Sequence, residues 1–344
     1  MPSCELAVAT GIQRNEPDVT RIYNWLPDRV DIRLRVIAGA YLVAQILLVG
    51  TGGLVRLTSS GLGCPTWPEC SASSFVPTPE LGIHGVIEFS NRVLGAVLGI
   101  IAIIAFIAIL RLRRQRRDLF WLTLLAGLGI PAQAVIGGIS VLTKLNPYVV
   151  GLHFIISVVL VALCTVFLYR VYTAPTPRSV VVPRWFAIVT HITSFFVAIT
   201  IVFGILTTGS GPHAGDAHSP RNGLDPVVLQ HVHSWPAYAT FVLTIVLVIG
   251  SVRFRLLPAR RYALWLLAIE FVQIGVGLIQ ANTGLPGILV GIHMMLACLL
   301  ASAMTAVILN LKRPSVPDAA AAGSATVAGA APATGTAPGP VAAR

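Results

Sequence analysis

Eight apolar segments, each about 20 residues or slightly longer, constrain this chain more than any other feature of its sequence. They cover residues 34–56, 86–110, 119–142, 149–169, 185–207, 228–252, 262–282 and 288–311. A helix of about 20 apolar residues spans the hydrocarbon core of a bilayer. Only 11% of the residues are charged, against roughly 25% in soluble domains. The sequence therefore predicts an all-α integral membrane protein with eight transmembrane helices.

Positive charge alternates between the loops at the two ends of these helices. One end holds Arg29, Arg33, Arg35, the run RLRRQRR at 111–117, Arg170, Arg178, Arg184, Arg253, Arg255, Arg260, Arg261, Lys312 and Arg313. The opposite loops hold little beyond Arg56, Lys144 and Arg221. Because cytoplasmic loops carry an excess of Lys and Arg, we predict a multi-pass protein of the cell membrane with both termini in the cytoplasm. This arrangement accounts for the net charge of +11 without nucleic-acid binding.

The second half of the chain repeats the first. Residues 133–153 (QAVIGGISVLTKLNPYVVGLH) and 273–293 (QIGVGLIQANTGLPGILVGIH) share eight identities in 21 positions without a gap, and both end on a histidine. A weaker match links RLTSSG (56–61) with LTTGSG (206–211). Because each copy contains an even number of helices, both copies enter the membrane in the same direction. The sequence predicts two four-helix bundles related by a pseudo-two-fold axis along the membrane normal.

The repeat also divides the chain into domains. The first bundle is predicted at 34–174 and the second at 185–313, joined by a cytoplasmic linker at 175–184. A cytoplasmic segment at 1–33 precedes them, and the tail at 314–344, rich in Ala, Gly, Pro and Thr, is predicted to be disordered.

Three histidines share one predicted depth, one to two turns inside the outer ends of their helices: His153, His233 and His293. Polar residues within a membrane bundle usually face its interior and mark function. In the second bundle, His233 and His293 would face each other as the axial ligands of a b-type haem. His231 points to a different face and is the alternative ligand on that helix. The competing interpretation is that each histidine only hydrogen-bonds to a neighbouring helix.

Polar residues also gather at the outer end of the first bundle. Cys64 and Cys70 share the loop GLGCPTWPECSAS, for which we favour a disulfide over two free thiols or half of a metal site. Extending the repeat register sets Glu88 opposite Gln230 and Asn91 opposite His233. Without further context, Glu88 and Arg92 are equally well explained as an ion pair at the end of a helix.

Together these motifs resemble the heme A synthase family. The resemblance is carried by GGLVRLTSSGLGCPTWPEC (52–70), IEFSNR (87–92), TTGSGPHAGD (207–216) and the two repeated histidine segments, and it covers roughly 33–312. It implies oxidation of the C8 methyl group of haem O to a formyl group, which gives haem A for terminal oxidases. It also implies an eight-helix fold of two halves, each with a potential haem site, and haem O synthase as a partner. Self-association into a homo-oligomer is left open.

The resemblance assigns roles to particular residues. It places the family's carboxylate on Glu88, one haem ligand on His153, and the C-terminal ligand pair on His233 and His293. It also places the family's outer-loop cysteine pair on Cys64 and Cys70.

The sequence departs from the family at one position of the first bundle. The histidine of the family's E-x-x-H-R motif is Asn91 here, and His84 lies seven residues before it on roughly the same helix face. Three alternatives therefore remain: Asn91 fills that axial position, His84 fills it, or it is empty. Arg92 is a candidate partner of a haem propionate, and His213 and His218 receive no role.

The halves differ in a way that predicts a division of roles. The second bundle keeps two histidines and has Gln230 in place of the carboxylate, which suits a permanently bound haem b. The first keeps Glu88 and loses one ligand, which suits a substrate haem O that enters and leaves. There Glu88 would stabilise positive charge on the methyl carbon or take a proton from water.

Two other functions compete with the enzyme interpretation. A b-type membrane cytochrome would pass electrons without modifying haem, but it would place haems at both faces, whereas the paired histidines here lie near the outer face. A proton-coupled transporter would hold its site near the midplane, and these polar positions are shallower.

Overall fold

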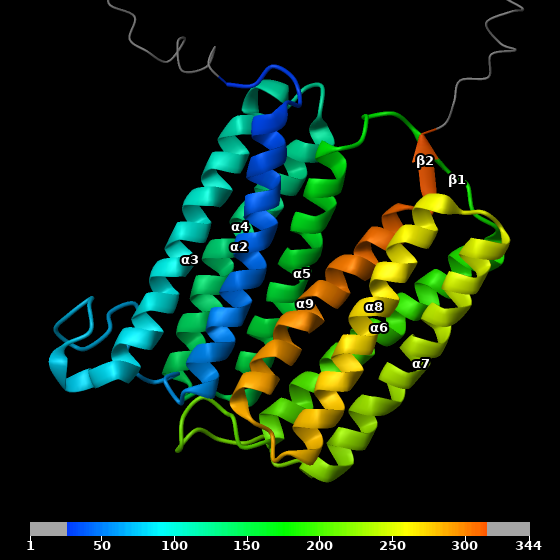
Figure 1. Ribbon diagram of the computed structural model, residues 1–344. Coiled ribbons are helices and arrows are strands. Elements are labelled where there is room, and N and C mark those ends of the chain that lie inside the picture. Colours follow the sequence, from blue (N-terminus) through cyan, green and yellow to red (C-terminus); the bar gives the residue numbers. More distant parts are fainter. Residues whose placement is uncertain (1–25, 315–344) are drawn as a thin grey trace, which may run out of the picture.

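The computed structural model describes residues 26–314 and is almost entirely helical over that range (Figure 1). Eight of its helices are long and apolar enough to cross a membrane, which confirms the predicted number of spans. They are α2 (Ile32–Leu57), α3 (Gly82–Ile109), α4 (Arg117–Leu142), α5 (Pro147–Val171), α6 (Arg184–Ser210), α7 (Pro226–Arg253), α8 (Leu257–Asn282) and α9 (Gly287–Leu309). Short 3-10 turns flank α3 at η1 (Pro79–Leu81) and η2 (Leu110–Leu112). Residues 1–25 of the predicted N-terminal segment, and the predicted tail from residue 315, lie outside the described residues.

Local sequence signals set several of the helix starts. The side chains of Asp31, Asn146 and Asp225 accept hydrogen bonds from backbone N–H groups in the first turns of α2, α5 and α7. Such caps satisfy N–H groups that have no partner within the helix. Proline follows directly after Asn146 and Asp225, at the helix position where its missing N–H costs nothing.

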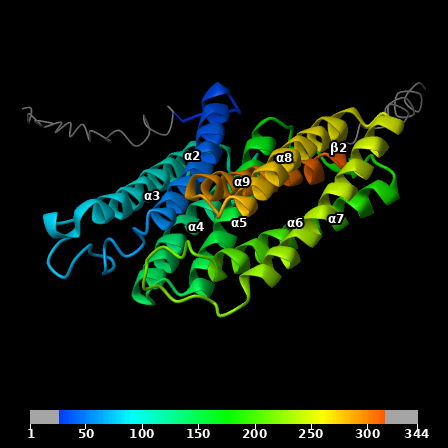
Figure 2. The same ribbon diagram turned by 60° about the horizontal axis from the view of Figure 1, so that its bottom comes forward.

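The helices form two groups of four, as the repeat predicts. Helices α2–α5 pack in a ring in which each helix contacts the next and α5 contacts α2; α6–α9 form a second ring. The groups meet where α9 packs against α2 and α5, and where α5 packs against α6 (Figures 1 and 2). In the repeat register, the α2–α9 contact corresponds to the contact between α6 and α5. The contacts agree with two four-helix halves, while the pseudo-two-fold axis stays a prediction.

Fully buried apolar packing is concentrated near one end of each group. In the first group the core comes from the start of α2 and α4 and the end of α3 and α5, and includes Leu34, Leu119 and Phe167. In the second group it includes Phe186, Leu266 and Val307. This is the end that carries most of the basic residues and at which both ends of the described chain lie (Figure 1). The three candidate histidines lie toward the opposite, less densely packed end.

A two-stranded sheet that the sequence did not predict joins the linker to the end of α9. Strand β1 (Arg178–Val180) pairs antiparallel with β2 (Lys312–Pro314), with Ser179 opposite Arg313. The Arg178 guanidinium also donates to the backbone carbonyl of Lys312. The predicted linker at 175–184 is therefore held against the second bundle. Strands of three residues are too short for an alternating pattern to reveal them.

Candidate functional site

The second bundle brings two imidazoles close together. The ring centroids of His233 on α7 and His293 on α9 lie 6.1 Å apart, and the ring planes make an angle of 71°. An imidazole nitrogen binds a metal at about 2 Å, so two such ligands on opposite sides of one metal place their ring centroids roughly 6 Å apart. The pair therefore has the spacing that two axial ligands of a haem iron require.

Contacts around His233 fix the orientation of its ring. Its Nδ1 lies 3.0 Å from the backbone carbonyl of Thr200 on α6. An N–H on Nδ1 that donates to this carbonyl leaves the lone pair of Nε2 free for a metal, and such outer partners typically orient ligating histidines. His231 is exposed on α7, so the structure brings His233 to His293, and not the alternative His231.

Glycines make room for both rings on neighbouring helices. A Cβ atom at Gly204 of α6 would lie 2.9 Å from Cε1 of His233, and one at Gly277 of α8 would lie 3.3 Å from Cε1 of His293. The Gln273 amide of α8 also donates to the backbone carbonyl of His293, at 3.2 Å. The imidazoles thus rest directly on helix backbones, where a larger side chain would displace them.

If His233 holds a haem, replacing Gly204 by alanine is expected to lower the haem content of the protein. The new methyl group would collide with the His233 ring, and overpacking of this kind costs about 1–3 kcal/mol, or roughly tenfold in affinity. Gly275→Ala is the matched control, because a Cβ there meets nothing within 4 Å. The measurement is the amount of haem per mole of purified protein in the two variants. If both variants lost haem equally, or if neither lost any, the placement of the His233 ring would be contradicted.

The first bundle repeats half of this arrangement. A Cβ at Gly137 would lie 3.3 Å from Cε1 and 3.8 Å from Nδ1 of His153, the same distances as those between Gly277 and His293. The Gln133 amide donates to the backbone carbonyl of His153 at 2.9 Å, as Gln273 does for His293. The Nδ1 atoms of both histidines are buried without a hydrogen-bond partner. The predicted register therefore extends from sequence to individual contacts.

Within residues 26–314, His153 has no imidazole opposite it that corresponds to His233. Asn91 stands at that register position, and its amide oxygen accepts a hydrogen bond from Thr51 of α2 at 2.7 Å. His84 is exposed, and its Nδ1 lies 2.9 Å from the Ser60 hydroxyl. Neither Asn91 nor His84 makes a hydrogen bond or ring contact with His153. Asn91 contacts the first helix of its bundle just as His233 does, which agrees with their equivalence.

Glu88 is buried, with 6% of its surface exposed, and both of its carboxylate oxygens are bound. One oxygen lies 2.6 Å from the Arg92 guanidinium, and the other accepts the backbone N–H of Cys64 at 2.7 Å. Arg92 also donates to backbone carbonyls of the outer loop, namely those of Cys64, Thr66, Pro68 and Glu69. The pair therefore holds a buried carboxylate directly beneath this loop.

The loop is closed by a disulfide between Cys64 and Cys70, as the sequence predicted. It rests closely on the helices below it. A Cβ at Gly138 of α4 would lie 2.3 Å from Cδ2 of Trp67, and one at Gly63 would lie 2.1 Å from the carbonyl oxygen of His84. The loop thus covers the end of the first bundle opposite its basic end, and it bridges α3 and α4.

Three polar residues that the sequence analysis did not assign have defined surroundings. Glu270 of α8 is buried, with one carboxylate oxygen accepting the Thr244 hydroxyl at 2.8 Å and the other without a partner. The sequence could have indicated Glu270, because it is a lone acidic residue inside the apolar segment 262–282, and ionisable residues within membrane segments often mark function. His213 lies 2.7 Å from the backbone carbonyl of Leu285, so it joins two outer loops of the second half. Arg56 also binds an outer loop of the second half, a contact that no pattern in the sequence indicates.

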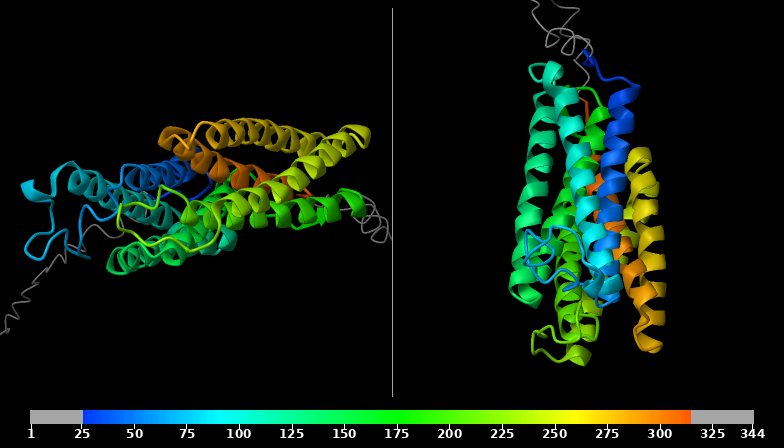
Figure 3. Two further views of the ribbon diagram at one scale, coloured as in Figure 1. Left: turned by 90° about the horizontal axis from the view of Figure 1, so that it is seen from below. Right: turned by 90° about the vertical axis from the view of Figure 1, so that its left-hand side faces the viewer.

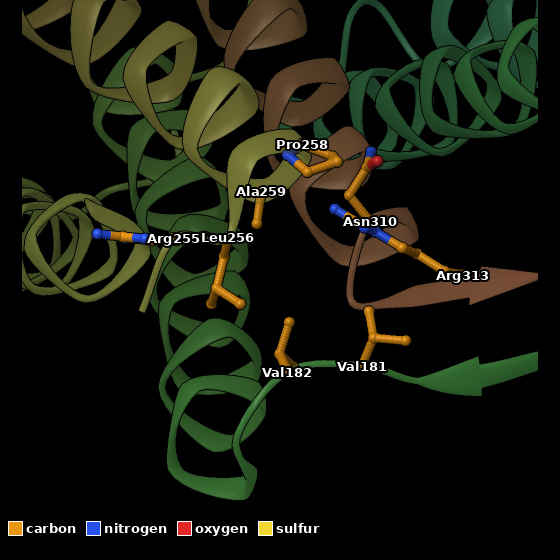
Figure 4. A pocket seen from close by; sticks show the side chains of 8 residues that line it. All are labelled: Val181, Val182, Arg255, Leu256, Pro258, Ala259, Asn310 and Arg313. Carbon is orange, nitrogen blue, oxygen red and sulfur yellow. The ribbon is translucent and has the colours of Figure 1, made fainter. Parts of the chain in front are cut away.

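The pocket in Figure 4 does not belong to this site. It lies beside the two-stranded sheet, at the basic end of the bundles, and its lining includes Val181, Leu256, Asn310 and Arg313. No candidate residue from the sequence analysis takes part in it. Among the residues that the structure describes, no group of three or more His, Cys, Asp or Glu side chains is arranged for a metal ion. A haem iron takes at most two axial protein ligands, so a haem site needs no such group.

Fold and site together define a multi-pass all-α membrane protein whose second bundle offers a pair of imidazoles with the spacing of haem ligands. Residues 35–305 match the COX15-CtaA family, described as cytochrome oxidase assembly protein. Because this match covers most of the chain, the chain belongs to that family.

Individual relatives are more distant. Over 177 residues the chain is 32% identical to a heme A synthase of Lysinibacillus sphaericus. The aligned region covers 48% of this chain and 56% of the relative. It is 26% identical over 215 residues to a heme A synthase of Staphylococcus epidermidis, covering 59% of this chain and 70% of the relative. A Bacillus cereus heme A synthase is 30% identical over 143 residues, which is 40% of this chain and 45% of the relative. The chain thus spans little more than half the length of the first of these relatives.

Proposed function

We propose that this protein is a heme A synthase, an oxidoreductase that converts the C8 methyl group of haem O to a formyl group and so makes haem A for terminal oxidases. The family match and the names of the relatives support the class of enzyme. The observation that carries the proposal is the difference between the bundles. One has two imidazoles 6.1 Å apart, and the other has a single comparable histidine, His153, and a buried carboxylate, that of Glu88.

The second bundle, at 185–313, would hold a resident haem b through His233 and His293. A bound haem b supplies one-electron chemistry. The protein's contribution is to hold both rings in place, through the Thr200 carbonyl on His233 and through Gly277 beside His293. Ligation from both sides makes release slow, as a permanent electron-transfer group requires.

The first bundle, at 34–174, is the site for the substrate haem O, with His153 as its ligand. Ligation from one side only suits a molecule that must enter, react and leave. Converting a methyl group to a formyl group replaces two C–H bonds by one C=O bond. With water as the source of the oxygen, this releases four protons and four electrons, and the electrons would leave one at a time through haem b to an external acceptor. The carbon attached to the porphyrin ring carries positive charge as the electrons leave. Glu88 is proposed to stabilise that charge, or to take a proton from an attacking water. Arg92 and the N–H of Cys64 fix the orientation of the carboxylate.

The proposal includes the placement of the protein in the cell membrane. With both termini in the cytoplasm, the disulfide loop and the histidines lie toward the outer face, where a disulfide persists. The substrate would come from a haem O synthase, since that class of enzyme makes haem O.

Extraction of haems from membranes that contain haem O, with and without this protein, tests the function. Haem A is expected only where the protein is present, and the purified protein is expected to carry haem b with the spectrum of two histidine ligands. If intact protein loaded with haem b leaves haem O unconverted, the b-type electron carrier replaces the enzyme. If the protein binds no haem at all, both are rejected in favour of a transporter.

A further inference from the structure

Arg56 belongs to the first bundle but binds the second. It lies in the last turn of α2, and its guanidinium donates to the backbone carbonyls of His213 and Thr208. Close by, the N–H of Gly61 donates to the carbonyl of Gly215 at 2.9 Å. The outer loop after α6 therefore reaches under the first bundle (Figure 3, left).

These contacts place Arg56 close to the histidine pair, on the side that faces the loop after α6. Thr208 lies four residues beyond Gly204, the glycine beside the His233 ring, and hence about 6 Å further out along α6. Leu57, next to Arg56, lies against Gly291 of α9, where a Cβ would be 3.1 Å from its Cδ1. His293 follows Gly291 by two residues. The Arg56 guanidinium is thus about one helical turn outward of the two imidazoles.

A second cation accompanies it. Arg221 donates to the carbonyls of Ser219 and Pro212, the latter adjacent to the His213 carbonyl that Arg56 binds. Within residues 26–314, neither arginine has a carboxylate within 4.0 Å. Arg56 uses two of its five N–H donors on carbonyls. Adjacent cations with only neutral partners favour an anion.

We infer that Arg56 and Arg221 bind the propionate carboxylates of the haem held by His233 and His293, so that the first bundle completes the cofactor site of the second. This inference rests on the proposed function. Guanidinium and carboxylate form strong, charge-assisted hydrogen bonds, and Arg56 has three N–H groups beyond the two that bind carbonyls. The Arg56 contact would also make haem binding hold the two bundles together.

The repeat supports one such site and not two. In the register that aligns RLTSSG with LTTGSG, the counterpart of Arg56 is Leu206. At this position the second bundle therefore has no arginine that could bind a loop of the first bundle. At this register position, only the haem of the second bundle would gain an arginine from the other bundle.

Titration of the full-length protein, purified without haem, with iron protoporphyrin IX and with its dimethyl ester tests this inference. The ester lacks both carboxylate charges. Wild type is expected to bind the acid form about tenfold or more tightly than the ester, because a hydrogen bond to a charged group contributes about 1.5–3 kcal/mol. Arg56→Leu, which introduces the residue of the repeat, should lose most of that preference, and Arg56→Lys should keep part of it. Lys144→Gln, which removes an exposed cation from another outer loop, should leave it unchanged.

The ester also separates charge recognition from loop damage. A loosened loop in Arg56→Leu would weaken binding of both compounds equally, and that outcome overturns the inference, as does equal binding of both by wild type. In either case a two-histidine haem spectrum would leave the proposed function standing. If wild type binds neither compound, the proposed function fails together with the inference.

Discussion

His293→Ala is expected to remove haem b from the protein and to abolish haem A formation. The His233 and His293 rings are held 6.1 Å apart, and within the described chain no other imidazole has a ring contact with either of them. Loss of a hydrogen-bond partner of a metal ligand already costs about 10–100-fold in affinity, so loss of the ligand itself should cost more. Spectra of the purified protein and its extracted haems provide the measurement.

His231→Ala is the control for this variant. It removes an imidazole from the same depth of α7, but His231 is exposed and turned away from His293. Its haem b content should match that of wild type. If His231→Ala lost haem b and His293→Ala kept it, the ligand assignment would be wrong. If both variants kept haem b, the second bundle would not be its site.

Most of the fold could be predicted from the sequence because the membrane limits the alternatives. Backbone groups in a bilayer must be satisfied within a helix, so eight long apolar runs specify eight helices. Each end was predicted to within five residues; the largest differences are at α8, which begins at Leu257 and not 262, and at α3, which begins at Gly82 and not 86. Polar caps and basic residues extend helices beyond the apolar run, and hydropathy does not detect them.

The histidine pair could also be predicted, because the repeat transfers information between the halves. His153 and His293 share a register, and the structure gives them matching contacts with Gly137 and Gly277. Contacts between loops carry no such periodic signal. The bonds of Arg56 to Thr208 and His213 join residues about 150 positions apart. Residues that far apart meet only after both bundles have packed, so no local pattern predicts the contact.

The role of Glu88 could be predicted only in part from the sequence. The sequence offered either a catalytic carboxylate or an ion pair at the end of a helix. The structure contains the ion pair with Arg92, and it adds the Cys64 N–H as a second partner. Glu88 therefore anchors the outer loop, whatever chemistry it performs. A variant that deletes the side chain cannot distinguish these roles.

Glu88→Gln separates them, and we expect it to abolish haem A formation while haem b remains bound. Glutamine has nearly the same shape and retains one oxygen that can accept the Cys64 N–H, but its NH2 cannot accept from Arg92 and it carries no charge. Loss of a charge that stabilises the transition state, or of a general base, slows a reaction by about 10²–10⁴-fold. Haem extraction gives the ratio of haem A to haem O, and the rate at which a thiol reductant opens the Cys64–Cys70 disulfide reports on the loop.

Glu88→Ala and Arg92→Gln complete the comparison. Both remove contacts that hold the loop, so both should speed reduction of the disulfide, whereas Glu88→Gln keeps the contact with the Cys64 N–H and should speed it less. Arg92→Gln keeps the carboxylate and should retain measurable haem A formation. If Glu88→Gln makes haem A at the wild-type rate while Glu88→Ala does not, then Glu88 is only a loop anchor. The positive charge on the reacting carbon would then have to be stabilised by another group of the first bundle.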